Sequence, residues 1–444
     1  MSDGKVSLED TAAAQFETGR LHVGAGGCPI SKLGEAFNPF AGEFLEDPYR
    51  FLQTARRDEA VFYSPEIDHW VVTKYSDVRE VFENPGVFGA ANTLSAVTPM
   101  SPKVGQILRD SGFRMNPVLT NLDPPDHARI RKHAVNSFST RRVAESEGWI
   151  REVVDLHIDR LLAHARGADG LRHADLVKDF AYDLPAHVVV RFLGVPEEDI
   201  ANIKAWTRNR VMLTWGRCDE SAQLAEVDGL IAMWKFCERL VEGMLQGDRP
   251  GFIGSLVEFH LGNPSELSVN EIESILFTML VAGHETTTNA LASSFVTLLE
   301  DPARWAALAE DPSLIPNVVE EMLRYRPSII AWRRIAKEEA SIGTVRVPKG
   351  GRVLLMLASA NHDESQFPEP HTVNFGRHNA KRHVAFGHGV HLCIGAGLAR
   401  LEMRVVLEQM ALRIPGLRLD SPQEFEYLPN LSFRGPARVR VQWP

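Results

Sequence analysis

The sequence predicts a mostly α-helical protein with a small β portion, organised as a single domain. Between residues 124 and 326, apolar side chains recur with helical spacing, and short breaks rich in glycine and proline separate the helices. Two shorter stretches, 61–75 and 342–357, are instead rich in the β-branched and aromatic residues typical of strands. No internal repeat, low-complexity tract or linker divides the 444 residues, although that length would permit about three average domains.

The first third of the chain predicts a tail, a hairpin and a long loop. Residues 1–35 lack a regular apolar pattern and a signal-peptide pattern, so we expect a loose N-terminal tail. The segment VFYSPEIDHWVVTKY (61–75) predicts a β-hairpin because two β-rich runs flank SPEIDH. Residues 84–126 are rich in Pro, Gly, Ser and Asn, and they predict a long irregular loop of the kind that often covers a substrate.

The remaining elements are predicted as helices, a short β region and a last helix. The helical region breaks at GADG, LGVP, GDRPG and LGNPSE. Its longest apolar run, 275–299, has HETTTN at its centre, and because a glutamate is costly in lipid we expect a core helix rather than a membrane span. Strand character returns at 342–357, and a coil at 361–385 leads to the final helix.

Charge and cysteine content exclude several classes of protein. The net charge of −10 argues against a general nucleic-acid binder. The four cysteines, at positions 28, 218, 237 and 393, have neither the spacing of a disulfide framework nor that of an iron–sulfur centre. We therefore expect a cytoplasmic protein in a reducing environment, without a membrane anchor.

The stretch FGHGVHLCIG (386–395) places Cys393 in a glycine-rich loop directly before the last helix. The glycines allow a tight turn, and the N-terminus of a helix favours a negative charge. Cys393 is therefore expected to ionise to a thiolate more easily than an ordinary cysteine. From the loop alone, two alternatives stay open: an inert core cysteine, and a nucleophilic pair with His391.

Two further motifs are informative only in combination with the cysteine loop. Glu321 and Arg324 in VVEEMLRYRP share one helix face, and such a pair alone is most often a surface ion pair worth under about 1 kcal/mol. In AGHETT (282–287), Gly283 would let a large planar ligand approach the helix backbone. Glu285 and Thr286 supply an acid and a hydroxyl able to pass protons, unless this is a polar patch where the helix reaches the surface.

In their order and separation, the three motifs resemble those of the haem-thiolate monooxygenases, the cytochromes P450. The resemblance extends from GGCPIS (26–31) to Pro444 and implies the cytochrome P450 fold, with one haem domain over residues 36–444. Stretches such as SPEIDHWVVTKYSDV, DPPDHARIR and YLPNLSFRGP are similar to the bacterial self-sufficient subfamily, whose haem domain is fused to an FMN/[2Fe–2S] reductase. The chain ends at VRVQWP with no reductase domain, which implies a stand-alone relative or an excised haem domain.

The resemblance implies haem b (iron protoporphyrin IX) as the cofactor, with the Cys393 thiolate as the protein ligand of its iron. The cofactor-binding residues that it implies are Cys393, His127, Arg131, Arg334, His391, Phe386 and Gly283. His127 and Arg131 lie one helical turn apart, so both could reach the haem propionates, although a solvated helix face is the alternative. Arg333 could take the place of Arg334.

The same resemblance assigns two further groups of residues. Glu285 and Thr286 resemble the family's acid–alcohol pair, which delivers protons to dioxygen and would be the catalytic residues here. Glu321 and Arg324, joined by Arg377, resemble a structural ion-pair group that braces the cysteine loop. Val373 stands where the family usually has phenylalanine, which leaves the packing of that coil open.

The implied activity is insertion of one O2-derived oxygen atom into a small hydrophobic, mainly aromatic substrate, by hydroxylation or by O- or N-dealkylation. The substrate pocket is expected from the 85–118 loop, residues 278–286, Ile329–Ala331 and the Leu428–Leu431 turn. A hydrogen-peroxide-driven peroxygenase that uses the same haem is the alternative, and a non-catalytic haem sensor or a cysteine nucleophile enzyme ranks below it.

Electrons would come from an external or fused NAD(P)H-dependent partner, a ferredoxin or an FMN/[2Fe–2S] reductase. The segment HARIRKHAVNSFSTRRVA (127–144) contains five Lys or Arg residues and no acid in a net acidic chain. The resemblance places this segment near the cysteine-ligated face of the haem, where an acidic partner would dock. A basic helix that only faces solvent is the plainer interpretation.

Overall fold

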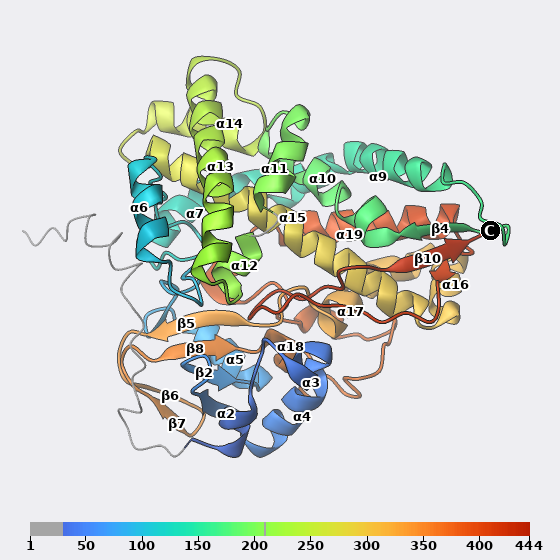
Figure 1. The fold of residues 1–444 in the computed structure, drawn as a ribbon, viewed down its shortest axis with the longest axis horizontal. Coiled ribbons are helices and arrows are strands. Elements are labelled where there is room, and N and C mark those ends of the chain that lie inside the picture. Colours follow the sequence, from blue (N-terminus) through green and yellow to red (C-terminus); the bar gives the residue numbers. More distant parts are fainter. Residues whose placement is uncertain (1–29, 208–209) are drawn as a thin grey trace, which may run out of the picture.

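The computed structural model describes residues 30–207 and 210–444, so Cys28 and most of the predicted tail lie outside the described residues. The described chain forms a large helical part and a smaller part that contains the main sheet (Figure 1). Its helices do not include one with the length and apolar character needed to cross a membrane. The mostly helical class with a small β portion is confirmed.

Within the described residues, thirteen α-helices belong to the large part, whose arrangement can be followed in Figure 1. They are α6 (Pro102–Asp110), α7 (Asp126–Ser137), α8 (Thr140–Glu145), α9 (Glu147–Leu162), α10 (Leu184–Leu193), α11 (Ile200–Thr207), α12 (Arg210–Trp215), α13 (Glu220–Gln246), α14 (Gly251–Gly262), α15 (Val269–Leu299), α16 (Pro302–Glu310), α17 (Ile315–Tyr325) and α19 (Ala396–Arg413). The smaller part contains α2 (Lys32–Ala36), α3 (Gly42–Glu46), α4 (Pro48–Asp58), α5 (Tyr75–Glu83) and α18 (Leu357–Ala360).

A five-stranded sheet with the order β1-β2-β8-β5-β3 organises the smaller part. Its strands are β1 (Val61–Ser64), β2 (His69–Val72), β3 (Phe88–Gly89), β5 (Trp332–Ala336) and β8 (Arg352–Leu355), and only β2 and β8 pair in parallel. The predicted hairpin is confirmed, with Val61 opposite Val72. The hairpin β6 (Ala340–Ile342) and β7 (Val345–Val347) and the sheet of β4 (Arg172–Asp175), β10 (Arg440–Trp443) and β9 (Arg418–Leu419) complete the β portion.

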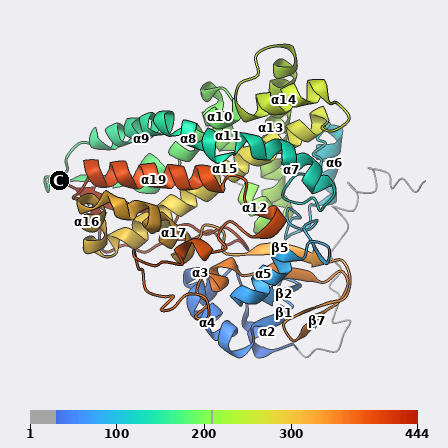
Figure 2. The ribbon, with the colours of Figure 1, turned by 180° about the vertical axis from the view of Figure 1, so that it is seen from behind.

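Helix α15 is the central element of the helical part, and both views show it running through the molecule (Figures 1 and 2). It begins with a reciprocal capping box between Ser268 and Glu271, which satisfies two backbone N–H groups of its first turn. Most of its side chains are buried against α10, α13, α14, α16 and α17. The apolar run at 275–299 is therefore a helix of the protein core, as predicted.

Two sequence-based expectations need correction. The 84–126 stretch is not wholly irregular, because α6 lies inside it, with Ser101 as its N-cap and Pro102 at its first position. The predicted tail likewise contains helix α2, whose N-cap is Ser31. Both are short helices. Helix α6 also buries Val104 and Leu108, four residues apart on one face, so its apolar spacing and its cap were readable signals.

The breaks LGVP and GDRPG meet in space, which fixes the entry of α14 against the end of α10. Gly194 has a φ of +83°, and a Cβ there would lie 2.1 Å from the carbonyl oxygen of Pro250. A side chain at Gly251 would in turn contact the Gly194 backbone. Glycine is therefore required at these two breaks by close backbone contact as well as by conformation.

Candidate functional site

The cysteine loop is a tight turn that presents Cys393 to an internal cavity. Gly387 and Gly389 have φ values of +72° and +70°, so two of the three predicted glycines supply the left-handed conformation that the turn needs. The Cys393 N–H donates to the Phe386 carbonyl oxygen at 2.9 Å, and α19 begins three residues after the cysteine. The thiol is exposed, but to the cavity rather than to the outer surface.

The local environment does not make Cys393 a thiolate by itself, which corrects the expectation from the helix N-terminus. Burial raises the pKa of the thiol, and this effect outweighs the opposing effects of the Gly395 N–H group and the Arg131 guanidinium. A metal ion would reverse the balance, because a coordinated thiol is deprotonated outright. No histidine of the described chain hydrogen-bonds to this thiol, so the nucleophilic pair receives no geometric support.

Four predicted haem-binding side chains gather beside Cys393. Arg131 of α7 donates to the Leu392 carbonyl oxygen at 2.6 Å, and the rings of His127 and His391 lie 4.3 Å apart. Arg334 of β5 lines the same cavity as Arg131, His391 and Cys393. Burial, followed by neighbouring arginines, lowers the pKa of His127 to about 4 and of His391 to about 3, so both rings are neutral at pH 7.

Side chains alternate between the two faces of strand β5, so Arg333 and Arg334 point in opposite directions and only Arg334 faces the cavity. Arg333 turns away from the cavity and donates to the carbonyl oxygens of Ser95 and Thr93, at 2.7 and 2.8 Å. Arg334 faces the cavity, with its guanidinium 4.9 Å from the centre of the Phe82 ring. Neighbouring residues of a strand point to opposite faces, which gives these two arginines different tasks.

Buried polar atoms without a hydrogen-bond partner indicate whether these residues fit a haem. Nε2 of His127, Nε2 of His391 and Nη2 of Arg334 are buried and have no hydrogen-bond partner in the described chain. Such buried nitrogens are costly unless a ligand accepts their hydrogen bonds. The propionates of haem are acceptors of this kind, and the Cys393 thiol is accessible from the same cavity. The residues present therefore fit the cofactor.

The AGHETT segment contributes Gly283 and Thr286 to the cavity, whereas Glu285 does not line it. The Thr286 hydroxyl donates to the Ala282 carbonyl oxygen at 2.8 Å. Burial raises the pKa of Glu285 to about 7, and its Oε1 atom has no hydrogen-bond partner in the described chain. His284, beside them, is neutral because burial lowers its pKa to about 4, and its Nε2 binds the Tyr182 carbonyl oxygen.

Gly283 has a packing role that the sequence did not reveal. A Cβ at this position would lie 2.4 Å from the side chain of Val189 on α10. The missing side chain is therefore needed for contact between α10 and α15, and not only for access by a ligand. Phe386, on the other side, lines the cavity beneath the Arg400 guanidinium, 4.6 Å from its ring centre.

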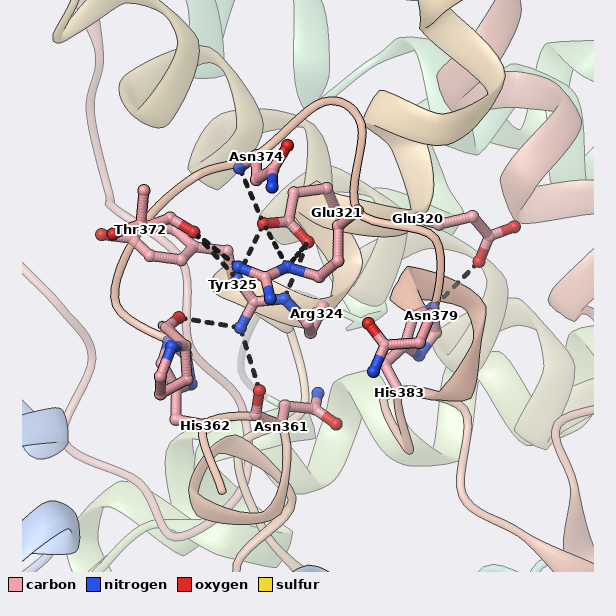
Figure 3. Close-up of polar contacts among 12 residues, drawn as sticks. Glu320, Glu321, Arg324, Tyr325, Asn361, His362, Thr372, Asn374, Asn379 and His383 are labelled. Atoms are coloured by element: carbon pink, nitrogen blue, oxygen red, sulfur yellow. Dashed lines mark hydrogen bonds and ion pairs between the residues drawn. The ribbon is translucent and has the colours of Figure 1, made fainter. Parts of the chain in front are cut away.

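The Glu321–Arg324 pair is fully buried, which excludes the surface ion pair (Figure 3). Arg324 donates to the Glu321 carboxylate at 2.7 and 2.8 Å, and Arg377 approaches the same carboxylate at 3.1 Å. Both guanidiniums also bind backbone carbonyls of the coil at 361–372. Val373, which stands where the family usually has phenylalanine, is half-buried against the main core. The expected contact of Glu321 with Arg324 and Arg377 is therefore present in the structure.

Glu320 is a second buried carboxylate that the sequence analysis missed. It accepts hydrogen bonds from His383 at 3.1 Å and from Arg400 of α19 at 2.8 Å. Burial raises the pKa of Glu320, but the hydrogen bonds from His383 and Arg400 prevail and lower it to about 2. This residue joins α17 to both sides of the cysteine loop. Its only signal in the sequence is a second glutamate on an otherwise apolar helix.

Glu402 of α19 is a third carboxyl group that sequence reasoning passed over. It lines the cavity, and its Oε1 atom has no partner in the described chain. Burial raises the pKa of Glu402 to about 8, so the group is mostly uncharged at pH 7. Its spacing from Leu398 and Val405 places it on the buried face of the helix, which was a readable signal.

The cavity has a volume of about 310 Å³ and a largely apolar lining. The predicted lining segments contribute Leu94, Met115, Thr278 and Ile329, whereas the Leu428–Leu431 turn contributes no residue and Phe433 lies there instead. The sequence analysis missed α10 and α12, which provide Val188, Val189, Phe192, Leu193, Arg210 and Trp215. Helix α10 reaches the cavity through its tertiary packing on α15.

The basic segment 127–144 is less positive in the folded protein than in the sequence. Arg129 pairs with Glu271 at 2.6 Å, Lys132 with Glu266 at 2.7 Å and Arg141 with Glu145 at 2.9 Å. Arg131 is turned to the cavity. Of the five basic residues, only Arg142 of α8 is without an ion pair in the described chain and outside the cavity lining, and α8 packs beside α19 (Figure 2).

Comparisons with known proteins agree with this geometry. A family model described as Cytochrome P450 matches residues 233–413. The chain is 34% identical to the cytochrome P450 monooxygenase PikC of Streptomyces venezuelae, and the match covers 94% of each protein.

Solved structures give the same result. The cytochrome P450 haem domain of Tepidiphilus thermophilus has a TM-score of 0.87 and 34% identity, with 93% of this chain and 97% of that chain covered. An intact type IV self-sufficient cytochrome P450 monooxygenase has a TM-score of 0.89 and 37% identity, over 94% of this chain. The match covers only 54% of that enzyme, so this chain corresponds to about half of its length.

Removing Arg324 should destabilise the protein strongly, because it leaves the Glu321 charge buried with one partner fewer. We expect Arg324→Ala to lower the free energy of unfolding by about 3–5 kcal/mol. The control is Arg141→Ala, which breaks an ion pair whose arginine is 89% exposed and should have little effect on the free energy of unfolding. Urea denaturation followed by circular dichroism measures both. Equal losses for the two variants would contradict a bracing role for the buried pair.

Proposed function

This chain belongs to the cytochrome P450 family of haem monooxygenases, and we propose that it oxidises small hydrophobic, mainly aromatic molecules. The observation that carries the proposal is the position of Cys393, whose thiol opens into an apolar cavity beside unpartnered donor groups. Haem held by a cysteine thiolate supplies the activation of dioxygen for insertion of one oxygen atom into a substrate. The side chains around it have separate tasks.

We propose that Cys393 binds the haem iron and that Arg131, Arg334, His127 and His391 hold the propionates. The support is the set of buried nitrogens that lack partners within the described chain. The two arginines supply positive charge, and the two neutral histidines supply hydrogen-bond donors without adding to it. Phe386 and Gly283 would contact the porphyrin, and the Glu321, Arg324 and Arg377 group would hold the coil that leads into the cysteine loop.

Thr286 and Glu285 would form the proton relay. The Thr286 hydroxyl lies at the cavity wall, and Glu285 lies beside it on the same turn of α15. A carboxyl group with a pKa near 7 can both give and regain a proton at neutral pH, which a hydroxyl alone cannot do. Since Glu285 does not line the cavity, the proton would pass through Thr286 or an intervening water.

The lining of the cavity supports an apolar, aromatic substrate. Phe138, Phe192, Phe277, Trp215 and Phe433 surround the space, and aromatic rings pack well against one another. Hydroxylation and O- or N-dealkylation are the reactions that we propose there.

We propose an external or fused NAD(P)H-dependent redox partner, either a ferredoxin or an FMN/[2Fe–2S] reductase. The structural likeness to an intact self-sufficient enzyme supports the second type. Helix α8, with Arg141 and Arg142 beside α19, is the proposed docking surface. The extent of the haem domain as residues 36–444 and a cytoplasmic location stay predictions.

The assignment of Cys393 is tested by reduction under carbon monoxide. We expect a strongly red-shifted Soret band for the wild-type holoenzyme, because thiolate ligation changes the absorption of the carbon monoxide complex. Cys393→Ser should lose that band and turnover of aryl ethers, whereas Cys218→Ser, at a half-buried thiol outside the cavity, should keep both. An unchanged spectrum in Cys393→Ser would mean that another residue holds the iron.

The proton relay predicts a pH-dependent variant series. In the wild type, product formed per NAD(P)H should fall as the pH rises through about 7, because the Glu285 carboxyl loses its proton there. Glu285→Gln should be slower and lack this pH step. Thr286→Ala should release more hydrogen peroxide per NAD(P)H, and Thr286→Ser should restore coupling. The same pH step in Glu285→Gln would assign it to a different group.

The docking surface is tested by charge reversal. Arg141→Glu with Arg142→Glu should slow electron transfer several-fold at low salt and less at high salt, because salt screens surface charges. The matched control, Arg346→Glu with Lys349→Glu, makes the same charge change on β7 and the turn that follows it, and it should have little effect. Stopped-flow reduction at several ionic strengths measures the rates. No salt dependence in the α8 variant would remove α8 as the docking surface.

A further inference from the structure

The apolar cavity contains an arginine that has no acidic partner. Arg210, at the start of α12, lines the cavity, and its guanidinium lies 5.8 Å from the centre of the Phe277 ring. Within the described chain, this guanidinium makes that contact with the ring but no hydrogen bond and no ion pair. Burial is the only influence on its pKa, which falls to about 10, so Arg210 is still charged at pH 7.

A comparison of charges along the cavity shows why Arg210 stands apart. Three arginines line the space: Arg131, Arg210 and Arg334. Two of them, Arg131 and Arg334, lie at the cysteine end, where the proposed cofactor brings anionic groups. The one carboxyl group among the lining residues, that of Glu402, is mostly uncharged at pH 7. The Arg210 side chain is half-buried and lines this largely apolar space. A charge without a partner in such surroundings is costly, so Arg210 is suited to receive an anion from outside the chain.

The position of Arg210 relative to α15 sets the geometry of such a ligand. Phe277, which lies against Arg210, precedes Thr286 by nine residues of continuous helix. At 1.5 Å per residue this corresponds to about 13 Å along the helix axis. Apolar side chains, among them Val281 and Ala282, line the intervening wall. An anion bound at Arg210 would therefore place an apolar body of about that length toward Thr286.

We propose that Arg210 recognises an anionic group, a carboxylate or a phosphate monoester, at one end of an otherwise apolar substrate, and so selects the substrate of this enzyme. The inference rests on the proposed function, because it assigns the same cavity to the substrate. A guanidinium presents five N–H donors in a fork that matches carboxylate and phosphate oxygens. Contact with Phe277 holds the group inside the cavity when no anion is bound.

The experiment compares three ligands that share one apolar body: 6-phenylhexanoate, 6-phenylhexyl phosphate and the neutral 6-phenylhexan-1-ol. Calorimetric titration of the holoenzyme at pH 7.5 measures their affinities without reference to turnover. We expect at least one anion to bind about tenfold or more tightly than the alcohol, as for a charge-assisted hydrogen bond. The comparison between the two anions shows which class is preferred.

Variants distinguish a specific role of Arg210 from a general effect of removing one positive charge. Arg210→Gln should remove the preference for the anion and leave the affinity for the alcohol nearly unchanged, and Arg210→Lys should retain part of the preference. Arg346→Gln makes the same change on the exposed β6–β7 hairpin and should keep it in full. The carbon monoxide spectrum of each variant verifies that it is folded and holds haem. Equal affinity of the wild type for anions and alcohol, or an unchanged preference in Arg210→Gln, overturns the proposal.

Failure of this inference is distinguishable from failure of the proposed function. Turnover of a neutral aryl ether and of the three ligands is measured in the same preparations. Oxidation of the ether without any preference for anions overturns the role of Arg210 and leaves the proposed function standing. A preference for anions that depends on Arg210, with no oxidation of any aromatic compound, supports the binding role and overturns the proposed substrate class.

Discussion

The structure depends first on the buried carboxylate of Glu321, which pairs with two guanidiniums, those of Arg324 and Arg377. A buried charge is tolerated only when its partners are complete, and here the same arginines also bind the carbonyl groups of a coil that has no regular secondary structure. This coil leads to the cysteine loop. The charge pairing thus contacts the coil that precedes the loop from residues 16 to 72 positions before Cys393.

Around that loop, some buried polar groups have hydrogen-bond partners and others do not. Glu320, His383 and Arg400 complete one another and join α17 to α19. In contrast, His127, His391 and Arg334 each leave a buried nitrogen without a partner in the described chain, all near one end of the cavity. A site that binds the polar edge of a cofactor needs both kinds of group. The satisfied groups hold the surrounding structure, and the unsatisfied groups can donate hydrogen bonds to the cofactor.

Charged side chains lie at the two ends of the cavity with an apolar wall between them, which gives the ends different roles. The cysteine end combines two arginines with the neutral His391, behind which His127 packs. The middle wall is apolar, and a third arginine lies at the far end against Phe277. Charges in an apolar space act strongly, because water does not screen them. Glu402, which is neutral at pH 7, does not cancel the positive charge. Hydrophobic packing thus sets the volume of the site, and a few charges set the orientation within it.

Much of the site could be predicted from the sequence, because the determining signals are local. Glycine spacing before an apolar helix predicted the turn at Gly387 and Gly389, and helical spacing predicted that Glu321 and Arg324 share a face. The central helix α15 was predicted from its apolar run. The state of the Cys393 thiol was not, since the helix N-terminus favours ionisation but burial, a tertiary property, raises the pKa.

The sequence by itself determined the mostly helical class, the long core helix and the turn around Cys393, because each follows from spacing along the chain, whereas the groups expected to bind haem came from the resemblance to a family. Only the tertiary structure decided between Arg333 and Arg334, required Gly283 for contact with Val189, buried Glu320 and Glu402, and brought Arg210 to the cavity. Those outcomes depend on contacts between segments distant in sequence. Burial and partner geometry are properties of such contacts, and no local pattern records them.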